Sequence, residues 1–297
     1  MEEIDWDNLD KYVVKGTCME VEKKYFRLTC APNPEAVRPE PVLRKALALV
    51  KQKWKEEANY QYTIDQLRSL RQDLKVQHIE NDLTVDTYET NARISLENGD
   101  IRSFKECQTA LPDLYKEGNA GSQAEFAAYQ IMYTAFSVTT GPSKNLVVTG
   151  APSNRALSKM LQELKKETRQ HEAVQHANRV REAVRDNNYV AFFRLHEEAP
   201  FMGAYLMDIY MQTMRVKGLR SILRAYRPTI PIDAVRETLV YDEDEEEDEK
   251  AFAAFLQEQG VVVKEGSDPP LIDTKASLEA AKRLDKEREE EAKQKRF

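Results

Sequence analysis

The stretches Ala92-Arg-Ile-Ser-Leu-Glu-Asn-Gly-Asp-Ile-Arg-Ser-Phe104 and Val180-Arg-Glu-Ala-Val-Arg-Asp-Asn-Asn-Tyr-Val-Ala-Phe192 repeat one pattern, and this pattern decides the fold. In each stretch an apolar helix stops at Asn-Gly-Asp or Asn-Asn, and a Phe follows four or five residues later. Gly99 and the Asn pair tolerate the left-handed conformation that ends a helix, and Asp100 or Asn188 can cap the next helix. The repeat predicts one helical hairpin used twice, and stacked hairpins of this kind build an α-solenoid.

Further helices are predicted around these hairpins. Apolar residues recur at helical spacing in 42–54 and in 60–80, while 125–138 and 156–167 supply helices between the two hairpins. The Pro-rich connector 29–41 is predicted to be extended and to follow a short helix, and 139–153 is predicted to be an exposed, mobile loop. Because the chain has only 10 Gly and 12 Pro, a β-rich fold is disfavoured and the fold class is mainly α, with TPR-like helical hairpins.

Near residue 217 the pattern changes to that of a C-terminal winged helix. A helix over 216–226 leads into a short strand at 227–232, and Asp233 is predicted to cap a helix over 234–241. Another helix stops at Gly260, and the strands 261–263 and 271–272 form a predicted hairpin. The predicted domains are an acidic lead-in (1–14), N-terminal helices with the Pro-rich connector (15–59), a helical-repeat arm (60–215), a winged helix (216–276) and a charged tail that is a solvated helix or frayed (277–297).

Charge is strongly segregated along the chain. The net charge of −7 includes an unbroken acidic run, Asp242–Glu249, whereas 41–55 and 209–232 contain basic residues and no acidic ones. Each basic stretch is predicted either to contact a polyanion or to form an ordinary solvated helix face. In the second stretch, the basic residues at 217, 220, 224 and 227 are three or four positions apart and therefore share one helical face. The candidate nucleic-acid-binding residues are Arg44, Lys45, Lys51, Lys217, Arg220, Arg224 and Arg227.

The sequence contains no recognisable catalytic or metal-binding motif. There is no Gly-rich phosphate loop or nucleophile elbow, and His171 and His176 are five residues apart, so they point to different sides of a helix. Cys18, Cys30 and Cys107 lack metal-ligand spacing and are predicted to be reduced thiols. No apolar run approaches ~20 residues and no signal peptide is present, which predicts a soluble intracellular protein. We expect no catalytic residues, cofactor or metal. An enzyme whose active site is assembled from residues distant in the sequence is kept as a further hypothesis.

Several strings along the chain belong together as a set. They are Val14-Lys-Gly-Thr-Cys-Met-Glu-Val-Glu-Lys-Lys-Tyr-Phe-Arg-Leu-Thr29, Pro34-Glu-Ala-Val-Arg-Pro39, Ser69-Leu-Arg-Gln-Asp-Leu74, Tyr88-Glu-Thr-Asn-Ala-Arg93, Gly99-Asp100, Phe104-Lys-Glu-Cys-Gln108 and Asn188-Tyr-Val-Ala-Phe-Phe-Arg194. This set resembles the SAC/GANP family of PCI-domain proteins from about Val13 to Leu278. It is most similar to the branch linked to transcription and pre-mRNA splicing. The resemblance implies a helical-repeat arm fused to a winged helix (a PCI domain), in agreement with the residue pattern.

The resemblance also implies a cellular setting. It implies a nuclear, non-catalytic subunit of an mRNA-processing complex, linked to transcription elongation, splicing and mRNA export, and a longer N-terminal region before residue 1. The implied partners are a second PCI-domain subunit and a small acidic protein of the Sem/DSS type. In such complexes paired winged helices form a joint basic surface for RNA or DNA. In this sequence that surface corresponds best to Lys217, Arg220, Arg224 and Arg227, which suit phosphate contacts more than base readout.

Two features of the predicted winged helix leave alternatives open. The acidic run precedes the third helix, where it would repel a phosphate backbone, so we expect no base readout by that helix. The run itself is predicted to favour the helix dipole, to remain a loop or to contact a basic partner. Val261, Val262, Val263 and Ile272 either face a partner through the wing sheet or fill the core.

A pure protein-interaction scaffold without nucleic-acid binding is the alternative function. The salt dependence of nucleic-acid binding distinguishes this scaffold from the nucleic-acid-binding subunit.

Overall fold

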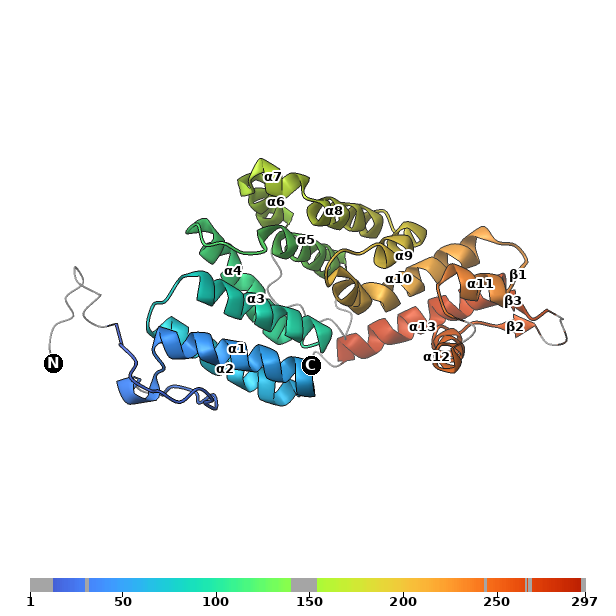
Figure 1. The fold of residues 1–297 in the computed structure, drawn as a ribbon. Helices are drawn as coiled ribbons and strands as arrows, with labels where there is room; N and C mark the ends of the chain where they lie inside the picture. Colours follow the sequence, from blue (N-terminus) through green and yellow to red (C-terminus); the bar gives the residue numbers. More distant parts are fainter. Residues whose placement is uncertain are drawn as a thin grey trace. The chain divides into compact units, whose positions relative to one another are not determined.

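Pairs of neighbouring helices stack along most of the chain (Figure 1). The computed structural model describes residues 13–29, 32–139, 154–242, 245–264, 266 and 269–294. The predicted loop 139–153 and the acidic lead-in fall almost wholly outside these residues. The chain forms two compact units, residues 1–130 and 131–297, and the division lies inside helix α5 (Gln123–Thr139).

The first unit contains a short 3-10 turn and four complete helices. These elements are η2 (Pro34–Ala36), α1 (Glu40–Glu57), α2 (Tyr60–Val76), α3 (Asp82–Glu97) and α4 (Ile101–Lys116). Each helix packs against the next one in the chain. The apolar faces of α1, α2 and α3 form one core, which includes Leu43, Leu47, Leu67, Leu70 and Leu74. Burying a Leu side chain contributes about 1.5–3 kcal/mol, so this shared core stabilises the stacked pairs more than helix propensity does.

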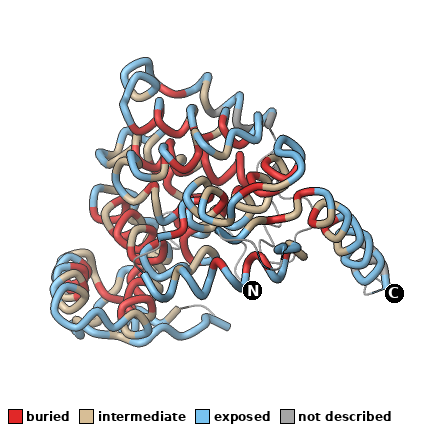
Figure 2. The backbone as a smooth tube through the Cα atoms, turned by 90° about the vertical axis from the view of Figure 1, so that its right-hand side faces the viewer, coloured by how far each residue is buried: buried red, intermediate tan, exposed pale blue. Residues whose placement is uncertain are grey.

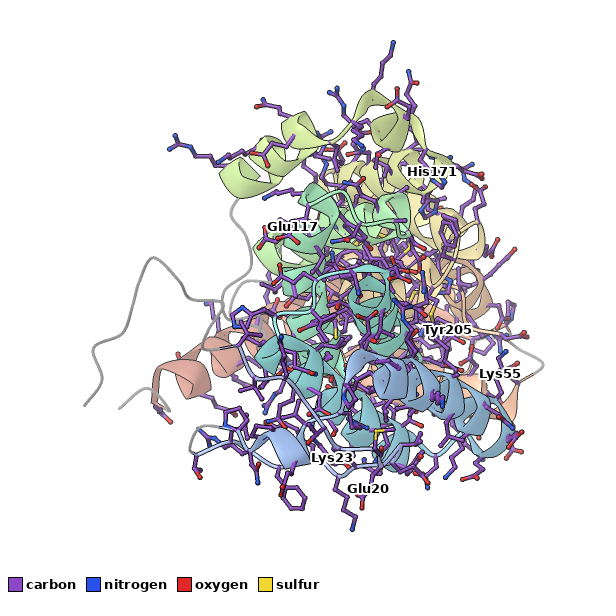
Figure 3. All side chains as sticks on the ribbon, turned by 60° about the vertical axis from the view of Figure 1, so that its left-hand side comes forward. Glu20, Lys23, Lys55, Glu117, His171 and Tyr205 are labelled. Carbon is purple, nitrogen blue, oxygen red and sulfur yellow. The ribbon has the colours of Figure 1, made fainter. Side chains whose placement is uncertain are left out.

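The segment 13–29 is not helical, and the short helix predicted before the Pro-rich connector is therefore wrong. This segment runs along α2 as an extended arm, on which Figure 3 labels Glu20 and Lys23. Its backbone bonds to side chains of α2 and its C-cap: the N–H of Lys23 donates to Gln66 Oε1 at 3.1 Å, and the N–H of Gly16 donates to Oε1 of the C-cap residue Gln77 at 3.0 Å. These side-chain acceptors satisfy donors that a helix would otherwise have satisfied internally.

A buried ion pair holds this arm against α2. The Arg38 side chain is fully buried, and its Nε donates to Oδ2 of the equally buried Asp73 at 2.7 Å. The other guanidinium nitrogens donate to the Val21 carbonyl and to Ser69 Oγ, both at 2.9 Å. Lys23 Nζ adds a second cation at 2.6 Å from Asp73 Oδ1. The carboxylate therefore joins the arm, the Pro-rich connector and α2.

The predicted hairpin turn is confirmed at both of its sites. After α3, Gly99 adopts a φ of +68°, and Asp100 caps α4 by accepting the Ser103 N–H at 2.9 Å. At the second site Asn187 takes the left-handed position with a φ of +52°, and Asn188 caps the next helix through the Ala191 N–H at 3.0 Å. The same residue chemistry thus turns the chain in both units.

The second unit is also built of packed helices and ends in a small sheet. Its elements are α6 (Asn154–Glu163), α7 (Lys166–Gln170), α8 (Glu172–Arg185), α9 (Tyr189–Glu197), α10 (Gly203–Ala225), β1 (Thr229–Pro231), α11 (Ile232–Thr238), α12 (Glu246–Glu258), β2 (Val263–Lys264), β3 (Leu271–Asp273) and α13 (Thr274–Gln294). Aromatic rings fill the core between the helices, where Phe136 stacks on Tyr210 at a centroid distance of 4.8 Å. Figure 2 shows the buried residues on the inner sides of the helices.

The C-terminal elements follow the order predicted for a winged helix. The three strands are antiparallel in the order β1-β3-β2, with Ile230 and Val263 both opposite Ile272. Two details differ from the prediction. The cap of α11 is Pro231, because the helix already begins at Ile232 and places Asp233 in its first turn. The predicted boundaries 215/216 and 276/277 fall inside α10 and α13.

Candidate nucleic-acid interface

The end of α10 carries the basic residues that the sequence singled out. This helix ends at Ala225, and Tyr226 is its C-cap, because the Pro at 228 cannot continue the helix and disfavours helical backbone at residue 227. Residues 217, 220 and 224 lie within two turns and share one side of α10. The structure therefore brings these three cations together, with Arg227 just beyond the helix.

Two of the four cations are engaged within the protein. Lys217 Nζ lies 3.0 Å from the hydroxyl oxygen of the buried Tyr210. Arg220 Nη2 donates to Asp285 on α13 at 3.2 Å, and the Arg220 side chain is only 12% exposed. Burial lowers the pKa of Arg220 below its ordinary value, with Asp285 opposing the shift. Both residues therefore contribute less to an external surface than their spacing predicts.

Arg224 and Arg227 are the exposed cations of the set. Within the described residues no hydrogen bond or ion pair involves the Arg224 side chain, which faces solvent. Arg227 folds back so that Nη1 donates to the carbonyls of Leu223 at 2.6 Å and Tyr226 at 2.9 Å. Its guanidinium nevertheless remains at the surface. Arg224 and the guanidinium nitrogens of Arg227 other than Nη1 are suited to bind phosphate oxygens.

Helix α13 packs against this site, a contact that was not predicted from the sequence. The charged tail was predicted to be either a solvated helix or frayed. Its described residues, up to Gln294, form a helix that packs against α10 and buries Ala281. Ser277 is also buried, and its Oγ accepts the Val262 N–H at 2.8 Å. The spacing of Leu278, Ala281 and Leu284 is the signal that could have predicted this packing.

The acidic run forms the start of the third winged-helix helix. Glu246 to Glu249 make up the first turn of α12, where negative charge is favoured by the helix dipole. Asp248 Oδ2 accepts the Asp242 N–H at 2.9 Å and closes the turn. Residues 243 and 244 lie outside the described residues. Residues 246–249 therefore lie in a helix and not in a flexible loop, at the position that the helix-dipole alternative requires, and contact with a basic partner stays a prediction.

The first basic stretch lies on α1, in the first unit, and is largely neutralised there. Arg44 donates to Asp82 at 2.8 Å and 2.9 Å and also to Glu40, and these hydrogen bonds raise its pKa. Lys51 lies 2.6 Å from Asp86. Lys45 is exposed, without a partner among the described residues. This arrangement fits a solvated helix face better than a phosphate-binding surface.

The proposed partner residues divide between surface and core. Val262 and Val263 are exposed, and β2 is an edge strand of the sheet, so its outer side is open. Val261 is half-buried. Ile272 is fully buried in the central strand, so it belongs to the core, and its prediction as an interface residue is wrong.

The other sequence candidates form no site. His171 caps α8 with its Nδ1, whereas His176 is buried and its Nε2 bonds to the Leu195 carbonyl at 2.7 Å. Cys18 and Cys107 are free thiols, and Cys30 lies outside the described residues. Over the described ranges, no group of three or more His, Cys, Asp or Glu side chains is placed to hold a metal ion. The same residues include no helix that is long and apolar enough to cross a bilayer.

Stacked helix pairs followed by a winged helix with a basic end define a PCI-type protein. The SAC3/GANP family profile matches residues 18–264, and the chain belongs to this family. It is 41% identical over 286 residues to SAC3 family protein A of Arabidopsis thaliana, covering 93% of this chain and 26% of that protein. It is 42% identical over 240 residues to the THP3 homolog of Schizosaccharomyces pombe, covering 80% of this chain and 57% of that protein.

A third relative is the leukocyte receptor cluster member 8 homolog of Xenopus laevis. It is 38% identical over 275 residues, which cover 93% of this chain and 32% of that protein. The chain thus spans about a quarter to somewhat more than half of the length of these relatives. The similarity to THP3 proteins places it in the branch that the sequence strings predicted.

Proposed function

We propose that this protein is a non-catalytic PCI subunit of a nuclear mRNA-processing complex that binds RNA or DNA through the basic end of its winged helix. In this proposal a second PCI subunit pairs with it, and a small acidic protein of the Sem/DSS type completes the complex. The membership of the SAC3/GANP family and the similarity to THP3 proteins support the setting. The mRNA-processing role and the partners rest on that family resemblance.

The single observation that supports nucleic-acid binding is the exposed pair Arg224 and Arg227 at the end of α10. Other cations of the chain, such as Arg44 and Lys51, are paired with carboxylates, which reduces what they gain from an added phosphate. The two arginines escape this neutralisation among the described residues. The acidic first turn of α12 disfavours insertion of that helix into a duplex groove. Contacts to the phosphate backbone are therefore the expected mode.

Binding of fluorescent single-stranded RNA across a salt series tests the proposal. Each phosphate contact to a single strand contributes about 0.7 to the slope of log K against log salt, so Arg224 and Arg227 together predict about −1.4 and all four cations about −3. Arg224→Glu/Arg227→Glu should flatten the slope by at least about 1.4. The matched control Lys165→Glu/Lys166→Glu changes the charge equally at exposed sites at the start of α7 and should leave the slope unchanged.

The alternative function is a protein-interaction scaffold without nucleic-acid binding. The open edge strand β2, with Val262 and Val263 exposed, favours it, because an unpaired edge is a ready template for a partner strand. If this alternative holds, an intact complex shows no salt-dependent RNA binding. In that case Val263→Lys dissociates the partner, whereas Arg224→Glu/Arg227→Glu does not.

A further inference from the structure

Tyr226 is a solvent-facing aromatic ring held by a fixed backbone. Its N–H donates to the Ile222 carbonyl at 3.1 Å, and its own carbonyl accepts from Arg227 Nη1 at 2.9 Å. The backbone is thus tied on both sides, yet the side chain is 53% exposed. Most large apolar side chains of this unit are buried in its core, so an anchored ring that faces solvent is available to bind a planar ligand.

Cations flank the exposed ring closely in the chain. Arg224 precedes Tyr226 by two residues and Arg227 follows it directly, and both are exposed. Thr274 Oγ1, at the start of α13, donates to the Pro228 carbonyl at 2.8 Å and brings the exposed Lys275 toward the same end of α10. An exposed ring with exposed arginines two residues before it and one residue after it offers the two contacts that single-stranded nucleic acid requires, namely phosphate contacts and a surface for base stacking.

Duplex nucleic acid cannot use the same ring. Its bases are stacked inside the helix, so a duplex would contact only the cations. The helix that most often enters the major groove in winged helices is α12, and its first turn bears Glu246, Glu247, Asp248 and Glu249. The site therefore offers single strands a contact that it does not offer to duplexes.

We propose that Tyr226 is a stacking platform for one unpaired base and that Arg224 and Arg227 hold the phosphates on either side, which makes the interface selective for single strands. This inference rests on the proposed nucleic-acid binding and names its ligand class. Sequence preference at this contact is weak, because every base has a face that can stack. Tyr226 acts through the face of its ring, so its hydroxyl is dispensable.

The test compares three probes of equal length: a single-stranded RNA, the corresponding duplex and an abasic strand with the same number of phosphates. Each is titrated into the full chain and into the complex purified with it. The variants are Tyr226→Ala, Tyr226→Phe and the control Tyr205→Ala. Tyr205 is another exposed tyrosine of α10, 45% exposed and labelled in Figure 3.

Tyr226→Ala is expected to weaken single-stranded RNA binding by roughly 5- to 100-fold without changing the salt slope. It should leave duplex and abasic binding within twofold of wild type. Tyr226→Phe and Tyr205→Ala should behave like wild type. An unchanged circular-dichroism spectrum and intact complex for Tyr226→Ala show that the loss is local.

Four results would overturn the platform. Equal losses for Tyr226→Ala and Tyr205→Ala, or equal losses on RNA and abasic strand, would remove the stacking role but leave salt-dependent binding, and with it the proposed function, in place. Dissociation of the protein partner by Tyr226→Ala would make the ring a protein contact. If wild type shows no salt-dependent binding to any probe, the proposed function fails, and the platform fails with it.

Discussion

Replacing Asp73 by Asn is expected to destabilise the first unit far more than the loss of any surface ion pair. The substitution keeps the shape of the side chain but removes its charge, which leaves the fully buried Arg38 and the neighbouring Lys23 without a counter-charge. Removing one partner of a buried pair costs about 3–5 kcal/mol. The exposed pair between Arg44 and Asp82 is the comparison, because breaking an exposed pair costs about 0.2–1 kcal/mol.

Urea unfolding followed by tryptophan fluorescence measures this difference. Both tryptophans of the chain, Trp6 and Trp54, belong to the first 130 residues, so the signal reports this unit alone. Asp73→Asn should lower the free energy of unfolding by about 3 kcal/mol or more, and Asp82→Asn by less than about 1 kcal/mol. A loss for Asp73→Asn that does not exceed the loss for Asp82→Asn would refute the buried clamp.

Three further predictions concern the second unit and the free thiols. Gly218→Ala places a Cβ 2.8 Å from Leu239 Cδ2, and overpacking should cost about 1–3 kcal/mol in thermal unfolding; a neutral result would contradict the close packing of α10. Burial raises the pKa of the Cys107 thiol to about 12, so it should resist alkylation at pH 8 in the native protein and react once unfolded, as mass spectrometry can show. Asp285→Asn should free Arg220 from its ion pair and allow one more phosphate contact. This contact should steepen the salt slope by about 0.7 and tighten RNA binding roughly fivefold at 0.1 M salt. Unchanged binding would show that Arg220 makes no phosphate contact.

Features that depend on neighbouring residues in the chain were predictable from the sequence. The turns at Gly99 and Asn187 and the caps at Asp100 and Asn188 follow from the conformational range and side-chain acceptors of those residues alone. The order of helices and strands in the winged helix is local in the same sense. Each of these signals spans fewer than ten residues, so no long-range contact has to be known.

Features that depend on contacts between distant residues were not predictable in this way. The arm 13–29 is extended because the side chains of Gln66 in α2 and of Gln77 at its C-cap accept backbone donors of the arm, and nothing within the arm indicates this. The spacing of the cations on α10 predicts that all of them are equally exposed, but Arg220 is covered by α13 and paired with Asp285, 65 residues later. The sequence leaves open whether Ile272 is an interface or a core residue. The strand order places it in the centre of the sheet, where it is buried.

Ultraviolet cross-linking of single-stranded RNA to the purified complex, followed by peptide mapping, locates the nucleic-acid interface. We expect cross-links on the tryptic peptide 225–236, which contains Tyr226, because Arg224 is a cleavage site and Arg227 precedes proline. The cross-links should disappear in Arg224→Glu/Arg227→Glu and persist in Lys165→Glu/Lys166→Glu. Cross-links confined to the partner subunit or to α1, with this peptide unmodified, would contradict a nucleic-acid interface at the end of α10.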